Sequence, residues 1–315
     1  MNSSPAQSKN KKPLVLVITG PTASGKSETA LLLAEKIQGE IISADSMQIY
    51  RGMDIGTAKV SRETRERIRH HLIDILDPGE PFSVAAYRKL AESAIRDALD
   101  RGARPILCGG TGQYLCALID HLNFTPQATD PALRSRLNEK ADQMGLPALW
   151  EELKKIDPQT RIAPTDRKRM IRALEVYELT GRPMSWHVAR SRDPEPDFDY
   201  RVYCLTWERA CLYRRIDERV LQMVDQGLED EAKSLLSQHL PQNTPCLQAI
   251  GYKEWIPYLN GKMTREETIS LIQQASRRYA KRQLTWFRKM KDVIWLENTE
   301  PQAACDRILS DLSLD

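Results

Sequence analysis

The sequence lacks any run of residues that could span a membrane or support a crosslinked, secreted fold. No stretch approaches eighteen consecutive apolar residues, so we expect no transmembrane helix. The first dozen residues, MNSSPAQSKNKK, have no apolar segment, and we expect residues 1–12 to form a disordered tail rather than a signal peptide. The six cysteines include no C-x-x-C pair and no nearby histidine doublet, which argues against zinc and against disulfides. Cysteines in this pattern fit a reducing cytoplasm. We expect the protein to be a monomer.

The net charge of +3 is too small to indicate a nucleic-acid partner, but the basic residues are unevenly distributed. Residues 277–291 hold seven Lys or Arg and no acid, and residues 167–172 hold four more. Three aromatic residues, Tyr279, Trp286 and Phe287, lie among the Lys and Arg residues of the first segment. They favour RNA as a binding partner, because aromatic rings stack on nucleobases. A solvated helix face explains either segment equally well.

Strands and helices alternate along much of the chain. This alternation is typical of an α/β fold, with a P-loop NTPase-like parallel sheet core flanked by helices. Short apolar, β-branched runs predict strands over residues 14–19, 40–44, 104–108 and 200–206. Apolar periodicity, with Ser83 as a cap, predicts helices over residues 24–38, 83–100, 208–226, 228–238 and 265–290.

Residues 120–199 break this alternation. The segment is charged and helical in pattern, and proline-rich stretches bound it at both ends. We interpret it as an inserted all-helical subdomain that binds RNA. Residues 13–119 and 200–315 then form the P-loop core with its C-terminal helices.

Residues 20–27, GPTASGKS, match the phosphate-loop pattern G-x-x-x-x-G-K-[ST] between a predicted strand and a predicted helix. The N–H groups of such a loop surround an anionic oxygen, and the following helix adds its positive end. Lys26 supplies a cation, and the Ser27 hydroxyl can bind Mg²⁺. The residues expected to hold a phosphate are Gly20, Pro21, Thr22, Ala23, Ser24, Gly25, Lys26 and Ser27.

The phosphate loop does not by itself indicate ATP hydrolysis. An ordinary NTPase or kinase has an apolar strand that ends in Asp and holds Mg²⁺, whereas the strand at 104–108 runs into a Gly-Gly-Thr sequence that ends at Thr111. The nearest candidate carboxylate is Asp45. Because the C-terminal ends of parallel strands share one edge, Asp45, Thr111 and the loop should converge on one crevice. From the residues alone, a purely structural role for Asp45, as a helix N-cap or turn residue, is as good an interpretation as a role in the crevice.

Seven segments occur in a fixed order: GPTASGKS (20–27), DSMQIYRGMDIGTAK (45–59), HHLIDILDP (70–78), GGTGQY (109–114), DRKRMIRALEVY (166–177), AIGYKE (249–254) and AKRQLTWFRK (280–289). Together they resemble the bacterial tRNA dimethylallyltransferases from about residue 14 to residue 297. Gln113 stands where we expect an apolar residue, a departure that touches no inferred role.

The resemblance implies transfer of a dimethylallyl group from dimethylallyl pyrophosphate to the exocyclic N6 amine of the adenosine 3′ of the anticodon, with release of pyrophosphate. It implies that residues 22–27 hold the pyrophosphate with Mg²⁺ as cofactor, and that Asp45, Lys26 and Thr111 are catalytic. The implied contacts with the tRNA anticodon stem-loop are Asp45, Ser46, Met47, Gln48, Thr111, Arg134, Lys168, Arg169, Met170, Ile171, Arg172, Gln248, Ala249, Ile250, Gly251, Tyr252, Lys253, Lys281, Arg282, Gln283, Leu284, Thr285, Trp286, Phe287 and Arg288.

The chemistry of this reaction agrees with the residues. An adenine amine is a poor nucleophile, whereas an allylic pyrophosphate ionises readily to a stabilised carbocation. Catalysis therefore requires stabilisation of the departing pyrophosphate and correct placement of the amine. The loop, Lys26 and Mg²⁺ meet the first requirement. Asp45 meets the second by accepting a hydrogen bond from the amine and later its proton.

Two pairs of side chains have open interpretations. Arg215 and Arg219 are four residues apart on a predicted helix, so they can close over the pyrophosphate or pair with Asp217, Glu218 or solvent. His70 and His71 precede the strand-like sequence LIDIL, and we interpret them as structural.

Three other functions compete with tRNA prenylation. An adenylate isopentenyltransferase would use the same donor on a free nucleotide, but a mononucleotide does not require the insertion or the basic C-terminal helix. A P-loop small-molecule kinase is disfavoured by the missing strand-end Asp. A nucleotide-dependent RNA-binding switch would need tight nucleotide binding, and the guanine-specific sequence N-K-x-D is absent.

Overall fold

The computed structural model describes residues 12–121, 130–190, 197–238, 240–241 and 244–313. The chain divides into two compact units, which we call the sheet unit (residues 1–118 and 197–315) and the helical unit (residues 119–196). The expected boundaries are 120 and 199. Strand β5 begins at Asp199, so that residue belongs to the sheet unit rather than to the insertion. The tail expected at residues 1–12 lies outside the described residues, apart from Lys12.

The sheet unit contains one parallel sheet with the strand order β3-β2-β4-β1-β5-β6. All four predicted strands are confirmed to within one residue, because each carries an apolar run that is buried inside the sheet. The two edge strands, β3 and β6, are not predicted. The fold is therefore the expected P-loop NTPase-like α/β fold. The strands are β1 (Leu14–Thr19), β2 (Gly39–Ser43), β3 (His70–His71), β4 (Arg104–Gly109), β5 (Asp199–Thr206) and β6 (Val293–Glu297).

The strand-like interpretation of the LIDIL sequence is wrong. The two histidines before it form β3, which pairs with Ile41 and Ile42 of β2, and residues 72–76 make only a single bridge, between Leu76 and Tyr50. His71 Nε2 lies 2.7 Å from Glu40 Oε2, and His70 Nδ1 lies 2.7 Å from the Ile68 carbonyl oxygen. These contacts agree with a structural role for both histidines.

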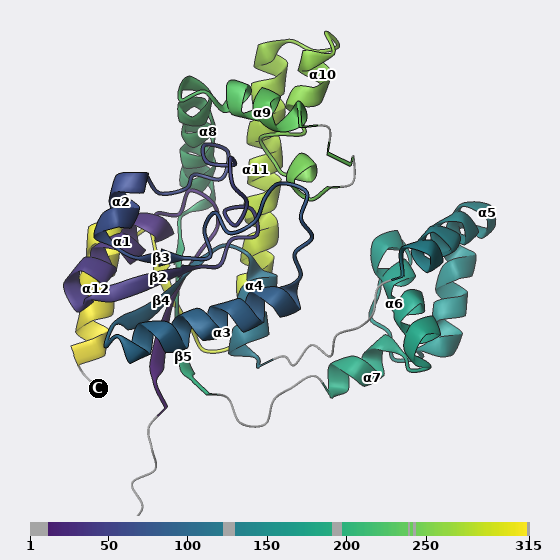
Figure 1. Ribbon diagram of the computed structural model, residues 1–315, viewed down its shortest axis with the longest axis horizontal. Helices are drawn as coiled ribbons and strands as arrows, with labels where there is room; N and C mark the ends of the chain where they lie inside the picture. Colours follow the sequence, from purple (N-terminus) through teal and green to yellow (C-terminus); the bar gives the residue numbers. More distant parts are fainter. Residues whose placement is uncertain (1–11, 122–129, 191–196, 239, 242–243, 314–315) are drawn as a thin grey trace, which may run out of the picture. The chain divides into compact units, whose positions relative to one another are not determined.

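Helices cover both faces of the sheet (Figure 1). The chain moves in opposite directions along the sheet from β1 to β2 and from β2 to β4, so right-handed crossovers place α1 and α3 on opposite faces. Helix α12 packs beside α1, and its Ala304, Cys305 and Ile308 join Leu16 and Ile18 in one buried core. The helices of the sheet unit are α1 (Lys26–Ile37), α2 (Arg62–Arg67), α3 (Val84–Asp100), α4 (Gly112–Ile119), α8 (Arg209–Asp225), α9 (Leu228–Leu236), α10 (Trp255–Leu259), α11 (Arg265–Phe287) and α12 (Pro301–Ser313).

A second apolar core lies beyond the C-terminal edge of the sheet. Side chains of α8, α9, α10 and α11 pack there against the segment that follows β2, with Tyr50, Trp255 and Ile272 among the buried members. In Figure 1 these helices gather around the loops that leave the strand ends. The arrangement surrounds the expected crevice with helices.

The helical unit has its own core. It consists of α5 (Pro131–Ile156), α6 (Arg167–Thr180) and α7 (Met184–Ala189) over its described residues. Leu149 and Leu174 are among the side chains buried between α5 and α6. Asp130 caps α5 by accepting hydrogen bonds from the N–H groups of its first turn.

Candidate active site

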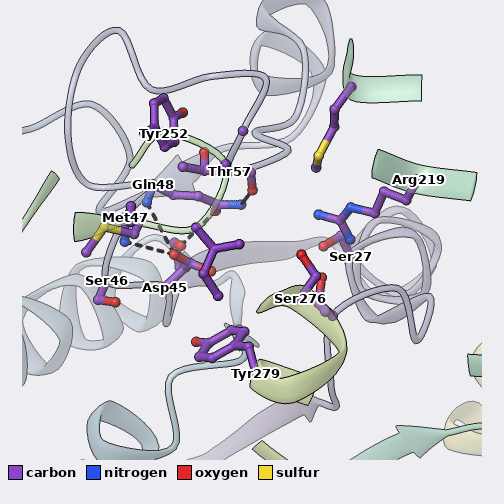
Figure 2. Close-up of a pocket in the computed structure, with 18 of the residues that line it drawn as sticks. Ser27, Asp45, Ser46, Met47, Gln48, Thr57, Arg219, Tyr252, Ser276 and Tyr279 are labelled. Carbon is purple, nitrogen blue, oxygen red and sulfur yellow. Dashed lines mark hydrogen bonds between the residues drawn. The ribbon is translucent and has the colours of Figure 1, made fainter. Parts of the chain in front are cut away.

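A cavity of about 360 Å³ opens at the C-terminal edge of the sheet. Its walls come from the phosphate loop, from residues 45–48 after β2, from residues 248–253, and from α8 and α11. Figure 2 shows Ser27 and Arg219 on one side of this cavity, and Asp45 with Met47 and Gln48 on the other. The expected convergence of the loop and Asp45 on one crevice is therefore present in the structure. The volume suits a small substrate.

The phosphate loop has the backbone geometry that its sequence predicts. Gly25 is the N-cap residue of α1, with φ of 94°, and no side chain caps this helix end. The first N–H groups of α1 therefore stay available to an anion. Thr22, Lys26 and Ser27 line the cavity.

Three basic side chains that line the cavity have no carboxylate partner among the described residues: Lys26, Arg219 and the exposed Arg282. Within the described residues, no Asp or Glu lies within ion-pair distance of Lys26 or Arg219. Burial, followed by repulsion from Arg219, lowers the pKa of Lys26, whose Nζ lies 3.3 Å from the Pro21 carbonyl oxygen. Burial also lowers the pKa of Arg219. A bound anion would neutralise both charges, so this side of the cavity is suited to a pyrophosphate.

Arg215 does not line the cavity. Its Nε donates to the Ala23 carbonyl oxygen at 3.2 Å, and its guanidinium lies 4.4 Å from the centre of the Trp207 ring. Neither arginine of the pair bonds to Asp217, which holds Arg277 instead. The two arginines therefore differ: Arg219 lines the cavity, as the first interpretation of this pair expects, and Arg215 bonds to the loop from outside the cavity.

Asp45 is fixed through one of its two oxygens. Its Oδ1 accepts hydrogen bonds from the N–H groups of Met47 at 2.8 Å and Gln48 at 3.3 Å. Among the described residues Oδ2 accepts none, which leaves it open to the cavity. Asp45 is thus a turn residue and a cavity residue at once.

Thr111 holds this segment in place rather than lining the cavity. Its Oγ1 accepts from the Ser46 N–H at 3.0 Å, and its own N–H donates to the Ala44 carbonyl oxygen at 3.1 Å. Thr111 therefore positions residues 44–46, and its catalytic contact stays a prediction.

Gln48 is held by three bonds around its amide. Its Nε2 donates to the carbonyl oxygens of Thr57 at 3.1 Å and Ala58 at 3.4 Å, and its Oε1 lies 3.1 Å from Ser43 Oγ. These bonds fix the positions of the amide oxygen and the amide nitrogen of Gln48. Gln48 lines the cavity beside Asp45.

The expected tRNA contacts differ widely in exposure. The side chains of Met170, Ile171 and Phe287 belong to buried cores, so the expectation that they contact tRNA is wrong for these side chains. Gly251, Tyr252 and Gln283 are buried but line the cavity, and Ser46, Met47, Arg172, Ala249, Ile250 and Leu284 are half-buried. The exposed members are Arg134, Lys168, Arg169, Gln248, Lys253, Lys281, Arg282, Thr285, Trp286 and Arg288.

A buried glutamine joins α11 to the phosphate loop. Gln283 Oε1 accepts from the Thr22 N–H at 2.9 Å, and its Nε2 donates to the Gly110 carbonyl oxygen at 2.9 Å. Ser276 and Tyr279 share its helix face and also line the cavity. The spacing of three and four residues between Ser276, Tyr279 and Gln283 is the sequence signal that could have identified this functional face.

The residues around Ser27 suit a magnesium ion bound mainly through substrate oxygens. Ser27 is exposed on the cavity, and Asp45 lies across from it. No group of three or more His, Cys, Asp or Glu in the described chain could form a metal site from side chains alone. Mg²⁺ commonly takes its remaining ligands from phosphate and water, so the donor set fits.

Among the described residues, every helix is too short or too polar to cross a bilayer. All six cysteines are free thiols.

The parallel sheet, the loop after β1 and the cavity define a P-loop phosphate-binding protein. The sequence from residue 48 to residue 290 matches the family model described as IPP transferase. The chain belongs to this family.

Relatives with close sequence or structure agree with this assignment. A tRNA dimethylallyltransferase of Pelotomaculum thermopropionicum is 47% identical over 97% of both chains, and one of Heliobacterium modesticaldum is 50% identical over 89% of this chain and 88% of the other. The crystal structure of the tRNA isopentenylpyrophosphate transferase of Bacillus halodurans is similar, with a TM-score of 0.70, 43% identity and coverage of 96% of each chain. A eukaryotic dimethylallyltransferase acting on tRNA has a TM-score of 0.80 and 29% identity, and the match covers 96% of this chain and 79% of the other.

Proposed function

We propose that this chain is a tRNA dimethylallyltransferase that transfers the dimethylallyl group of dimethylallyl pyrophosphate to the N6 amine of the adenosine 3′ of the anticodon. The observation that carries this proposal is that one cavity brings Asp45 together with two cations, Lys26 and Arg219, that form no ion pair with a carboxylate of the described residues. One side of the cavity fits an anion and the other fits a hydrogen-bond donor. Family membership supplies the reaction class.

The donor side of the cavity promotes loss of pyrophosphate. The bond between the allylic carbon and the pyrophosphate oxygen breaks, and its electron pair stays on that oxygen. Lys26, Arg219 and the free N–H groups of α1 stabilise the negative charge that develops. Bound at Ser27, Mg²⁺ would add positive charge at the same oxygens.

The acceptor side places the amine and takes its proton. The N6 lone pair forms a bond to the allylic carbon, and the nitrogen then carries an extra proton. Asp45 Oδ2 is free to accept a hydrogen bond from the amine and then this proton, while Oδ1 keeps the carboxylate in one orientation. A stacked adenosine must leave its stack to reach this point.

Exposed basic side chains support a tRNA acceptor. Lys281 and Arg282 are exposed on α11, Arg288 is exposed directly after it, and Lys168 and Arg169 are exposed on α6. Basic groups of this kind contact phosphates and dominate affinity for nucleic acid. We propose that tRNA binding uses both units of the chain, that the enzyme acts as a monomer, and that it works in the cytoplasm.

The adenylate isopentenyltransferase alternative is not favoured. A free nucleotide has no need of the helical unit or of the exposed Lys and Arg side chains. The relatives are also named for tRNA. The decisive experiment incubates the protein with radiolabelled dimethylallyl pyrophosphate and one acceptor at a time. The acceptors are bulk tRNA, AMP and ATP, each in its own reaction. Label in tRNA alone supports the proposal, and label in AMP or ATP alone contradicts it.

A further inference from the structure

One carboxylate outside the cavity ties a wall of the acceptor side together. Glu231 lies in the first turn of α9, and its Oε2 accepts from the N–H groups of Asp54 at 2.8 Å and Ile55 at 2.8 Å. Its Oε1 accepts from the N–H of Gly56 at 2.9 Å and from the Tyr252 hydroxyl at 2.7 Å. Three successive backbone amides around one anion form a nest, and here a side chain of the protein occupies it.

The nested segment is packed tightly against Tyr252. A Cβ atom at Gly56 would lie 2.7 Å from the ring and hydroxyl of Tyr252, so only glycine permits this approach. Gly56, Thr57 and Tyr252 all line the cavity, whereas Glu231 does not. Figure 2 shows Tyr252 and Thr57 on the same side of the cavity as Gln48. Glu231 therefore fixes two parts of this wall from behind.

The same segment orients the side chains that face the acceptor. The carbonyl oxygens of Thr57 and Ala58, directly after the nest, hold the Gln48 amide. The Gln48 N–H in turn donates to Asp45 Oδ1. A continuous series of hydrogen bonds thus runs from Glu231 through the 54–58 segment and Gln48 to the carboxylate that takes the proton.

We propose that Glu231 is a positioning residue for the acceptor adenosine, acting through the nest at residues 54–56 and through Tyr252. This inference rests on the proposed function, since it assigns the wall to the tRNA adenosine. Loss of the nest would let Gln48 and Asp45 shift relative to the amine. A displacement of about 1 Å far from the reacting atoms can cost roughly 10²-fold in rate. The donor side, built from Lys26 and Arg219, shares none of these bonds.

The test compares three variants of the full chain. Glu231→Gln keeps the shape but replaces one acceptor oxygen with an NH₂ group that faces N–H donors. Tyr252→Phe removes only one of the four bonds and covers the case in which the first variant does not fold. Glu229→Gln is the matched control, because Glu229 lies in the same turn of α9 but pairs with Lys233 and Arg265. Melting temperature, donor KM, tRNA Kd and the single-turnover rate at saturating substrates are measured for each.

We expect Glu231→Gln to lower the single-turnover rate on tRNA by about 10- to 100-fold. Tyr252→Phe should lower it less, and Glu229→Gln should leave it unchanged. Donor KM and tRNA Kd should stay within about twofold of wild type, which a general loss of structure would not allow. A normal rate in both Glu231→Gln and Tyr252→Phe overturns the inference, as does a fall in rate that Glu229→Gln shares. If the wild type does not prenylate tRNA at all, the proposed function fails first, so the two failures are distinguishable.

Discussion

At the scale of single residues, the proposed donor side depends on cations that form no ion pair with a carboxylate in the described part of the chain. Lys26 is the cation of the phosphate loop, and burial and Arg219 disfavour its charge in the free protein. The departing pyrophosphate supplies the missing negative charge. Lys26→Ala should therefore reduce turnover by about 10²- to 10³-fold, the range for loss of one preorganised donor to a developing anion. Steady-state prenylation assays measure this loss.

Folding and tRNA affinity should survive this change, because the loop is not an RNA-binding surface. Circular dichroism and a tRNA binding isotherm are the controls. Near-normal turnover in Lys26→Ala would show that the donor binds elsewhere.

In the proposed mechanism the two oxygens of Asp45 have different roles. Oδ1 accepts backbone hydrogen bonds that hold the carboxylate, and Oδ2 accepts the proton of the amine. Asp45→Asn keeps the size and one acceptor oxygen but loses the charge and the proton acceptor. We expect the single-turnover rate to fall by about 10²-fold or more, with small changes in the binding of either substrate. Rapid-quench measurements on preformed tRNA complexes give this rate directly.

The opposite pattern would change the role of this carboxylate. If Asp45→Asn loses tRNA affinity while bound tRNA reacts normally, Asp45 is a recognition residue. The proton then leaves to water or to pyrophosphate.

At the scale of elements, the Glu40 carboxylate links strand β2 to strand β3 and to the end of helix α3. It accepts two bonds from Arg101, at 3.0 and 2.7 Å, and one contact from His71 of β3. The Arg101 hydrogen bond, with help from His71, lowers the pKa of Glu40 from 4.5 to about 2. Because the folded pKa lies below the unfolded one, this stabilisation is complete above pH 4.5 and is lost as the pH falls to about 2.

Glu40→Gln should therefore destabilise the protein by a constant amount at neutral pH and by a shrinking amount below pH 4.5. Urea unfolding of both proteins across this range measures the difference in the free energy of unfolding. A difference that is the same at pH 7 and at the acid limit would contradict the assignment.

Helix α11 has one face in the active site and another in solvent. Gln283 bonds to the phosphate loop, Arg282 is exposed and also lines the cavity, and Arg288, the residue after the helix, is exposed. Arg282→Ala or Arg288→Ala should weaken tRNA binding broadly and reduce its salt dependence by about one unit of slope per lost phosphate contact. Binding isotherms at several salt concentrations measure the slope.

A matched control lies at the other end of the same helix. Arg265 pairs with Glu229 there, so Arg265→Ala should keep the wild-type slope. An unchanged slope in both Arg282→Ala and Arg288→Ala would leave this face as an ordinary solvated one.

The elements differ in how well the sequence predicts them, and burial explains the difference. Strand β1 is predicted because its run LVLVIT is buried almost throughout. Strand β6, VIWLE, is missed because an edge strand is only partly buried and because it follows a charged helix after only the short, basic segment 288–292. The phosphate loop and Asp45 are predictable, since strand ends of a parallel sheet share one edge. The bond from Glu231 to Gly56 is not, because residues 175 apart in sequence leave no local pattern.

At the scale of the whole molecule, the two units have separate hydrophobic cores that mutation can address one at a time. Leu149 is fully buried in the core of the helical unit, and Leu33 is fully buried in the sheet unit. Leu149→Ala should lower the stability of the helical unit by about 2–5 kcal/mol, through lost contacts and a residual cavity. It should weaken tRNA binding near the unfolding temperature of this unit and leave donor binding intact.

Calorimetry combined with donor and tRNA titrations checks this expectation. Leu33→Ala is the comparison, since it destabilises the unit that holds the donor site. Equal loss of donor binding in both variants would show that the two units do not unfold separately.

The cavity takes its walls from both ends of the chain, and this has a consequence for the protein during its own synthesis. Gln283 closes the site against Thr22, which is 261 residues earlier. At about 5–20 residues per second, the phosphate loop leaves the ribosome on the order of 10–50 s before its closing helix. Strand β1, which carries the loop, must also wait for its neighbours β4 and β5. We therefore expect prenyl transfer only after helix α11 has been translated and Gln283 has bonded to the loop.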